Sequence, residues 1–78
     1  MNSEALKQGR AAMAASDFGT AERIARALIL QVPDTQAFEL LANALRAQGR
    51  LEEALAAAER AVQFDPRSNS AHHTRAFI

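Results

Sequence analysis

Residues 35–68 read TQAFELLANALRAQGRLEEALAAAERAVQFDPRS, and this stretch decides the fold. Its apolar residues recur every three or four positions, which is the spacing of one face of an α-helix. The pattern is interrupted at Gly49 and stops at Pro66. Glycine ends helices because it accepts a left-handed backbone, and proline cannot continue one. The stretch therefore predicts two helices joined by a short turn. The two apolar stripes are Phe38, Leu41, Ala42 and Leu45, and then Leu51, Ala54, Leu55, Ala58, Ala61 and Val62.

Polar residues stand where the ends of these helices need them. Asp34 directly precedes the first stripe, where its side chain can accept a hydrogen bond from a backbone N–H of the first turn. Glu52 and Glu53 fall in the first turn of the second helix, where the helix dipole favours negative charge. For an earlier helix, Ser16 or Asp17 is expected to take the capping role that Asp34 has here.

The same pattern occurs earlier in the chain, at an offset of 33 residues. A run of matches at one offset indicates a repeated structural unit. We expect a first unit over 2–34, with helices over about 3–15 and 18–31, a second unit over 35–68, and a partial third unit or capping helix over 69–78. The matched pairs include Phe18 with Leu51, Ala21 with Ala54, Ala25 with Ala58, Ile29 with Val62 and Pro33 with Pro66. The inward face expected for the first helix is Ala5, Gln8, Gly9 and Ala12.

The composition agrees with closely packed helices. The 78 residues include 19 alanines but only four phenylalanines, and neither tryptophan nor tyrosine. Alanine favours helices and fills little core volume.

The formal net charge is zero, which argues against binding to nucleic acid or to an anionic membrane. Cysteine is absent, so thiolate chemistry and disulfides are excluded. We find neither a signal peptide nor an apolar run of about 20 residues, so a cytoplasmic protein is the expectation, and the alanine-rich, arginine-rich composition suggests a bacterial source.

The repeat resembles the tetratricopeptide repeat, a helix-turn-helix unit of about 34 residues with large, small and proline positions at fixed places. The second unit matches over its whole length, and its matching residues are Phe38, Leu41, Ala42, Leu45, Gly49, Leu51, Ala54, Ala61 and Pro66. The first unit keeps Gly9, Phe18, Ala21 and Pro33 but departs at Gln8 and Leu28. In residues 69–78, Ala71 and Ala76 are expected in register, with Arg75 where leucine is usual. The resemblance implies an all-α superhelix of antiparallel helix pairs, here two units and a short C-terminal helix, which we expect to be part of a larger bacterial protein.

The resemblance also implies a binding groove, because in this family the first helix of each unit lines a concave surface that holds a protein or peptide partner. The residues that map to this groove are Leu6, Arg10, Met13, Gln36, Glu39, Asn43, Arg46, Ser70 and His73, with Phe77 as a further candidate. Arg10 and Arg46 could hold a carboxylate by charge-assisted hydrogen bonds, and Asn43 could bond a peptide backbone. One subclass clamps the carboxylate tails of chaperones, but the corresponding positions here are Leu6, Arg10, Leu40, Ser70 and Thr74, so that partner class is not expected.

Two other functions remain open from the sequence. The chain could form a homodimer through its C-terminal end, or it could be a spacer or dimerisation segment attached to a catalytic domain elsewhere. Self-association would use the apolar residues Leu55, Val62, Phe64, Phe77 and Ile78.

Enzymatic and metal-binding functions are not expected. His72 and His73 are adjacent, and neighbouring helix residues point about 100° apart, so the pair does not chelate one ion well. Neither a phosphate-binding glycine loop nor a nucleophile with its base is recognisable, and we expect no cofactor. RNA reading by the similar pentatricopeptide arrays would need many units and a basic groove, which this neutral chain of two units lacks.

Overall fold

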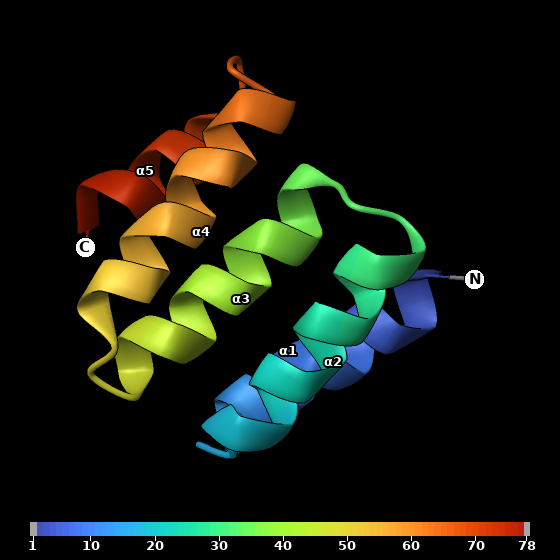
Figure 1. Ribbon diagram of the computed structural model, residues 1–78. Coiled ribbons are helices and arrows are strands. Elements are labelled where there is room, and N and C mark those ends of the chain that lie inside the picture. Colours follow the sequence, from blue (N-terminus) through green and yellow to red (C-terminus); the bar gives the residue numbers. More distant parts are fainter. Residues whose placement is uncertain (1, 78) are drawn as a thin grey trace.

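Five helices form the computed structural model, which describes the backbone of residues 2–77 and the side chains of residues 4–76. They are α1 (Asn2–Ala14), α2 (Phe18–Gln31), α3 (Thr35–Ala47), α4 (Leu51–Phe64) and α5 (Asn69–Phe77). Each helix packs against the next, and α3 also contacts both α1 and α5, so α3 lies at the centre of the molecule (Figure 1). The all-α fold expected from the repeat is confirmed, with helix ends within about one residue of those expected.

Small residues lie where the helices approach one another. Ala21, Ala25, Ala42 and Ala54 are each 0% exposed, so the backbones of α2, α3 and α4 come close together. The main core joins these three helices and contains one large side chain that is fully buried, Leu45. A second, smaller cluster joins α3, α4 and α5 through Phe38, Ala61 and Ala71.

The turns use local hydrogen bonds, and one predicted cap is wrong. Asp34 accepts a hydrogen bond from the backbone N–H of Ala37 at 2.8 Å, and Gly49 has a φ of 80°, as the sequence predicts. Asp17 precedes α2 but makes no capping hydrogen bond, because its backbone (φ −92°, ψ 70°) departs from the extended conformation that Asp34 adopts. Gln8 is exposed, so its expected inward position is also wrong.

The burial of α5 agrees with the expected register at Ala71 but not at Ala76. Among its described side chains, Ala71 and Thr74 are buried, whereas Ala76 is exposed. Ala71 and Thr74 lie 34 positions after Ala37 and Leu40, which are 2% and 5% exposed in α3, and the capping residues Asp34 and Ser68 are also 34 positions apart. Arg75 therefore lies 34 positions after Leu41, at the place where the repeat has a leucine. The helix is set in this register by Ser68, whose hydroxyl accepts from the backbone N–H of Ala71 at 3.1 Å.

A polar network around Glu22 joins the two helix pairs. The carboxylate of Glu22, which is 14% exposed, accepts from Gln48 at 2.9 Å, from Arg50 at 2.8 Å and from Arg26 at 2.9 Å. Gln48 and Arg50 belong to the turn between α3 and α4, so the network ties α2 to the second pair. The hydrogen bond from Gln48, helped by the two guanidinium groups against the cost of burial, lowers the pKa of Glu22 below its ordinary value of 4.5.

We expect Glu22→Gln to lower the free energy of unfolding by about 1 kcal/mol at neutral pH. Because the pKa is lowered in the folded state, the stabilisation by Glu22 is present above pH 4.5 and is lost as the pH falls below that value. The variant should therefore lose less stability than the parent protein on acidification, as measured by urea unfolding at several pH values. Glu59→Gln, on the exposed face of α4 and outside this network, is the matched control for the loss of a carboxylate. Parallel pH curves for the parent and Glu22→Gln would contradict the assignment.

Candidate functional site

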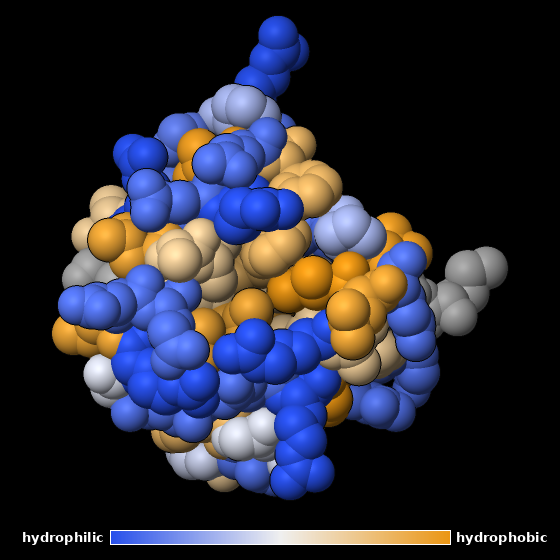
Figure 2. Space-filling model, in the orientation of Figure 1, coloured by the Kyte–Doolittle hydropathy of each residue, from blue (hydrophilic) through white to orange (hydrophobic). Residues whose placement is uncertain are grey.

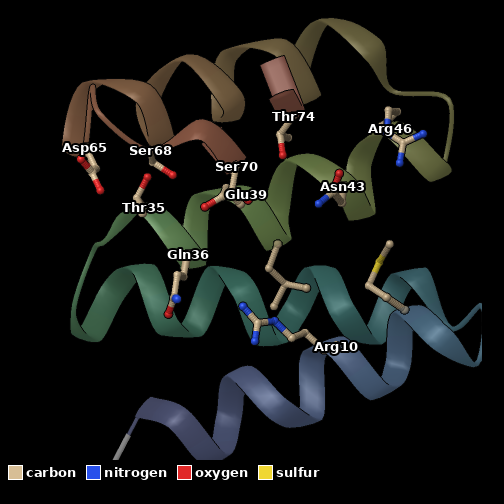
Figure 3. Close-up of a pocket in the computed structure, with 12 residues that line it drawn as sticks. Arg10, Thr35, Gln36, Glu39, Asn43, Arg46, Asp65, Ser68, Ser70 and Thr74 are labelled. Atoms are coloured by element: carbon tan, nitrogen blue, oxygen red, sulfur yellow. The ribbon is translucent and has the colours of Figure 1, made fainter. Parts of the chain in front are cut away.

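An open pocket of about 630 Å³ lies between α1, α3 and α5 (Figure 3). Residues of α1 and α5 form two opposing walls, α3 forms the floor between them, and the loop from α4 to α5 closes one end. The lining residues are Arg10, Met13, Thr35, Gln36, Glu39, Leu40, Asn43, Arg46, Asp65, Ser68, Ser70 and Thr74.

The floor is one face of α3. Gln36, Glu39, Asn43 and Arg46 follow one another at intervals of three or four residues, which places them on the same side of a helix. The opposite side of α3 carries Leu41 and Leu45, which are 6% and 1% exposed in the core. The helix is therefore anchored by its apolar stripe and presents a polar row to the pocket.

Hydrogen bonds between elements hold the pocket in shape. The hydroxyl of Ser70 on α5 donates to the Glu39 carboxylate on α3. The hydroxyl of Thr35 donates to the backbone oxygen of Ala61 at 2.5 Å, which links the start of α3 to α4. Asp65, in the closing loop, accepts from the backbone N–H of Arg67 at 3.2 Å. The α5 wall, the floor and α4 are thus connected directly to one another.

The structure brings together most of the residues mapped to the groove. Arg10, Met13, Gln36, Glu39, Asn43, Arg46 and Ser70 all line the pocket. Leu6 does not, because it is half-buried and packs against the main core. His73 is exposed and lies outside the lining.

Sequence reasoning missed several lining residues, and the repeat held a signal for one of them. Ser68 lies 34 residues after Asp34, and each precedes a first helix and accepts a hydrogen bond from the backbone N–H three residues later. Leu40 and Thr74 were considered only as chaperone-clamp positions. Asp65 follows the last helical residue of α4, and its place at the mouth of the pocket depends on how the loop between α4 and α5 turns.

The apolar residues proposed for self-association are only partly exposed. Leu55 and Phe64, both on α4, are 41% and 45% exposed, and Leu51 on the same helix is 52% exposed. Val62 is half-buried against the cluster of Phe38, Ala61 and Ala71, so it offers less apolar area to a partner than Leu55 or Phe64. The side chain of Phe77 and all of Ile78 lie outside the described residues.

Phe64 has a partner within the chain. Its ring stacks on that of Phe38, with centroids 5.3 Å apart and planes at 24°. The guanidinium of Arg60 lies 5.4 Å from the Phe38 centroid and 5.9 Å from that of Phe64, a cation–π arrangement. The exposed part of Phe64 is therefore the outer edge of a small cluster rather than an isolated ring.

A second hollow, of about 260 Å³, lies between α2 and α4 on the other face of α3. Apolar residues gather over this part of the surface in Figure 2, between polar residues of the flanking helices. The floor residues Phe38, Leu41 and Leu45 are at most 8% exposed. Little apolar area remains there for a partner to bury, so we regard the polar pocket as the better candidate site.

Within residues 4–76, no group of three or more His, Asp or Glu side chains is placed to hold a metal ion. The Nε2 atom of His72 lies 2.6 Å from the backbone oxygen of Pro66 and so takes part in the turn before α5. None of the helices in the described part of the chain has the length and apolar character that crossing a membrane requires.

Comparison with known proteins agrees with this architecture. The family model of the tetratricopeptide repeat matches residues 6–69, which is most of the chain. No curated protein and no solved structure shows significant similarity to the sequence. Repeats of this kind generally mediate protein–protein interaction and are typically non-catalytic. With two helix pairs, a fifth helix in the same register and this match, the chain belongs to the tetratricopeptide repeat family.

Proposed function

We propose that this chain binds an extended segment of a partner protein in the pocket between α1, α3 and α5. The observation that carries the proposal is the polar row of α3, flanked by polar side chains on both walls. Only two of the lining residues, Met13 and Leu40, are apolar, and Leu40 is 5% exposed.

The polar lining favours an extended segment over a helix. A helix satisfies its own backbone hydrogen bonds and docks through an apolar stripe, which needs an apolar groove. An extended segment presents unpaired N–H and C=O groups that need partners on the protein. Asn43, half-buried on the floor, can both donate and accept such hydrogen bonds, and Gln36 can do the same two turns away on the same face.

The connections across the pocket would favour binding. Because the Ser70–Glu39 and Thr35–Ala61 hydrogen bonds already fix α5 and α4 against α3, little further ordering of the protein is required. Preorganisation of this kind improves affinity by reducing the entropy lost on association.

We expect Asn43→Ala to weaken binding about tenfold, because it removes one or two backbone hydrogen bonds to the ligand. A random peptide library displayed on phage would be selected against the intact chain, and the selected peptides measured by fluorescence anisotropy. Gln63→Ala removes an amide from the exposed face of α4, away from the pocket, and is the matched control. Selected peptides that bind Asn43→Ala and the parent protein equally would rule out the pocket as the binding site.

Self-association is the second candidate function, and the exposed leucines of α4 favour it. Leu51 and Leu55 are four residues apart, so they form one apolar strip that a second copy could cover. In the same series of variants, Leu55→Glu should convert a dimer to a monomer in light scattering while leaving peptide binding intact. Asn43→Ala should do the reverse. A parent protein that is monomeric at high concentration would exclude this candidate, and a chain that neither binds peptide nor dimerises would leave the role of a structural spacer.

A further inference from the structure

We propose that the pocket selects a segment carrying a carboxylate and a cationic group, with the carboxylate against Arg10 on α1 and the cation against Asp65 beside α5. This inference rests on the proposed function, since it assigns the chemistry of the segment that the pocket binds and the side of the pocket that each of its charged groups faces. It follows from the way the charges of the lining are distributed.

The wall formed by α1 is cationic. Arg10 is exposed, and its side chain reaches over the floor of the pocket toward Gln36 (Figure 3). The ion pairs found in the described part of the chain involve Arg26 and Arg50 but not Arg10. Its guanidinium is thus available for a ligand carboxylate, with which it can form two parallel hydrogen bonds.

Two carboxylates lie near the α5 wall, one in the closing loop and one on α3. Asp65 lies in the loop that leads into α5, and the carboxylate of Glu39 is held toward the same wall by the hydroxyl of Ser70 (Figure 3). Ser68 and Ser70 add hydroxyl groups around these carboxylates. A lysine or arginine side chain arriving here would meet two negative charges and further hydrogen-bond acceptors.

The distance between the walls fits an extended segment. Since α3 lies between α1 and α5, and neighbouring helix axes are about 8–10 Å apart, a ligand that runs from one wall to the other crosses the width of α3. An extended chain advances about 3.3 Å per residue, so roughly four to six residues separate the two charged groups. Asn43 and Gln36 lie on the floor between the walls, where they face the backbone of such a segment. Arg46 lies past Asn43 at the far end of α3 (Figure 3).

Four synthetic peptides of equal length test this proposal. One has an acidic N-terminal half and a basic C-terminal half, the second has the reversed order, the third is uniformly acidic and the fourth uniformly basic. We expect one of the two mixed-charge peptides to bind about tenfold more tightly than either uniform peptide, with an affinity that falls as salt is added. A nitroxide on the acidic half should broaden amide signals of α1, and a nitroxide on the basic half should broaden those of residues 65–70.

Charge-changing variants complete the test. Arg10→Glu should lower the affinity for the preferred peptide about tenfold. Arg23→Glu, the same change on the exposed face of α2, should leave this affinity unchanged. Asp65→Asn should lower the same affinity by a smaller factor, and Asp17→Asn, in a loop outside the pocket, is its control.

Two results would overturn the charge assignment and leave the proposed function standing. One is equal binding of uniform and mixed peptides to the pocket, and the other is that the acidic half lies beside Asp65. Amide shifts confined to surfaces outside the pocket, or binding by none of the four peptides, would overturn the assignment as well, and the former would also exclude the proposed function.

Discussion

Leu45→Ala is expected to lower the free energy of unfolding by about 3 to 4 kcal/mol. Leu45 is 1% exposed and, among residues 4–76, is the one large side chain that is fully buried, and it packs in the cluster that joins α2, α3 and α4. Its neighbours Ala42, Ala54 and Ala58 have no side-chain torsions to rearrange, so they cannot fill the space left by the leucine. A domain of this size has a stability on the order of 4 to 12 kcal/mol, so the loss is a large fraction of the total.

Urea unfolding followed by circular dichroism measures this loss, and Leu30→Ala is the matched control. Leu30 lies on α2 and is 86% exposed, so the same atoms are removed from a side chain that is already in water. We expect the control to change the stability by no more than about 0.5 kcal/mol. Similar losses for the two variants would mean that Leu45 does not occupy the centre of the core.

The sequence predicts those parts of the fold that depend on backbone geometry and residue size. Ala21 and Ala54, 33 residues apart, are both 0% exposed, because a small side chain is what lets two helices approach. Gly49 adopts a positive φ, because a non-glycine residue would be strained at that turn. These requirements are local and repeat with the units, so they can be recognised without coordinates.

Features that depend on how elements meet could not be predicted in the same way. Asp17 and Asp34 both precede a helix, yet only Asp34 caps one, because the two loops approach their helices with different backbone angles. The register of α5 depends on Ser68 and on packing against Phe38, and its sequence alone allowed Ala76 as an inward residue as readily as Thr74.

The candidate site shows the same division. The residues of the α3 face were predictable from helical spacing, since one face of one helix carries them all. Asp65 was not, because it reaches the pocket only through the path of the loop after α4. The opposition between the cationic α1 wall and the carboxylates near α5 joins residues that are 55 positions apart in the chain, Arg10 and Asp65, and only the three-dimensional arrangement places them around one pocket.

Gly9→Leu is expected to destabilise the protein by about 2 to 3 kcal/mol and to disturb the pocket at the same time. A Cβ atom at position 9 would lie 2.4 Å from Cδ2 of Leu40 and 3.3 Å from Cγ2 of Ile24, so a leucine side chain has no space between α1, α2 and α3. Leu40 would have to move, and it is one of the two apolar residues of the pocket lining. The variant should therefore also have a lower affinity for the peptides selected for binding to the pocket. Fluorescence anisotropy measures this affinity under conditions in which the variant is still folded.

Two further glycine variants separate crowding from helix propensity. Gly9→Ala places only the Cβ atom against Leu40, and because a terminal methyl group can shift, the clash should roughly offset the gain of up to about 1 kcal/mol in helix propensity. Gly19→Ala, in α2, meets no atom within 4 Å and should raise the stability by about 0.5 kcal/mol. If Gly9→Leu were as stable as the parent protein, α1 would not pack on Leu40 as closely as these distances require. The α1 wall of the pocket, including Arg10, would then lie farther from the floor, and the proposed ligand geometry would fail with it.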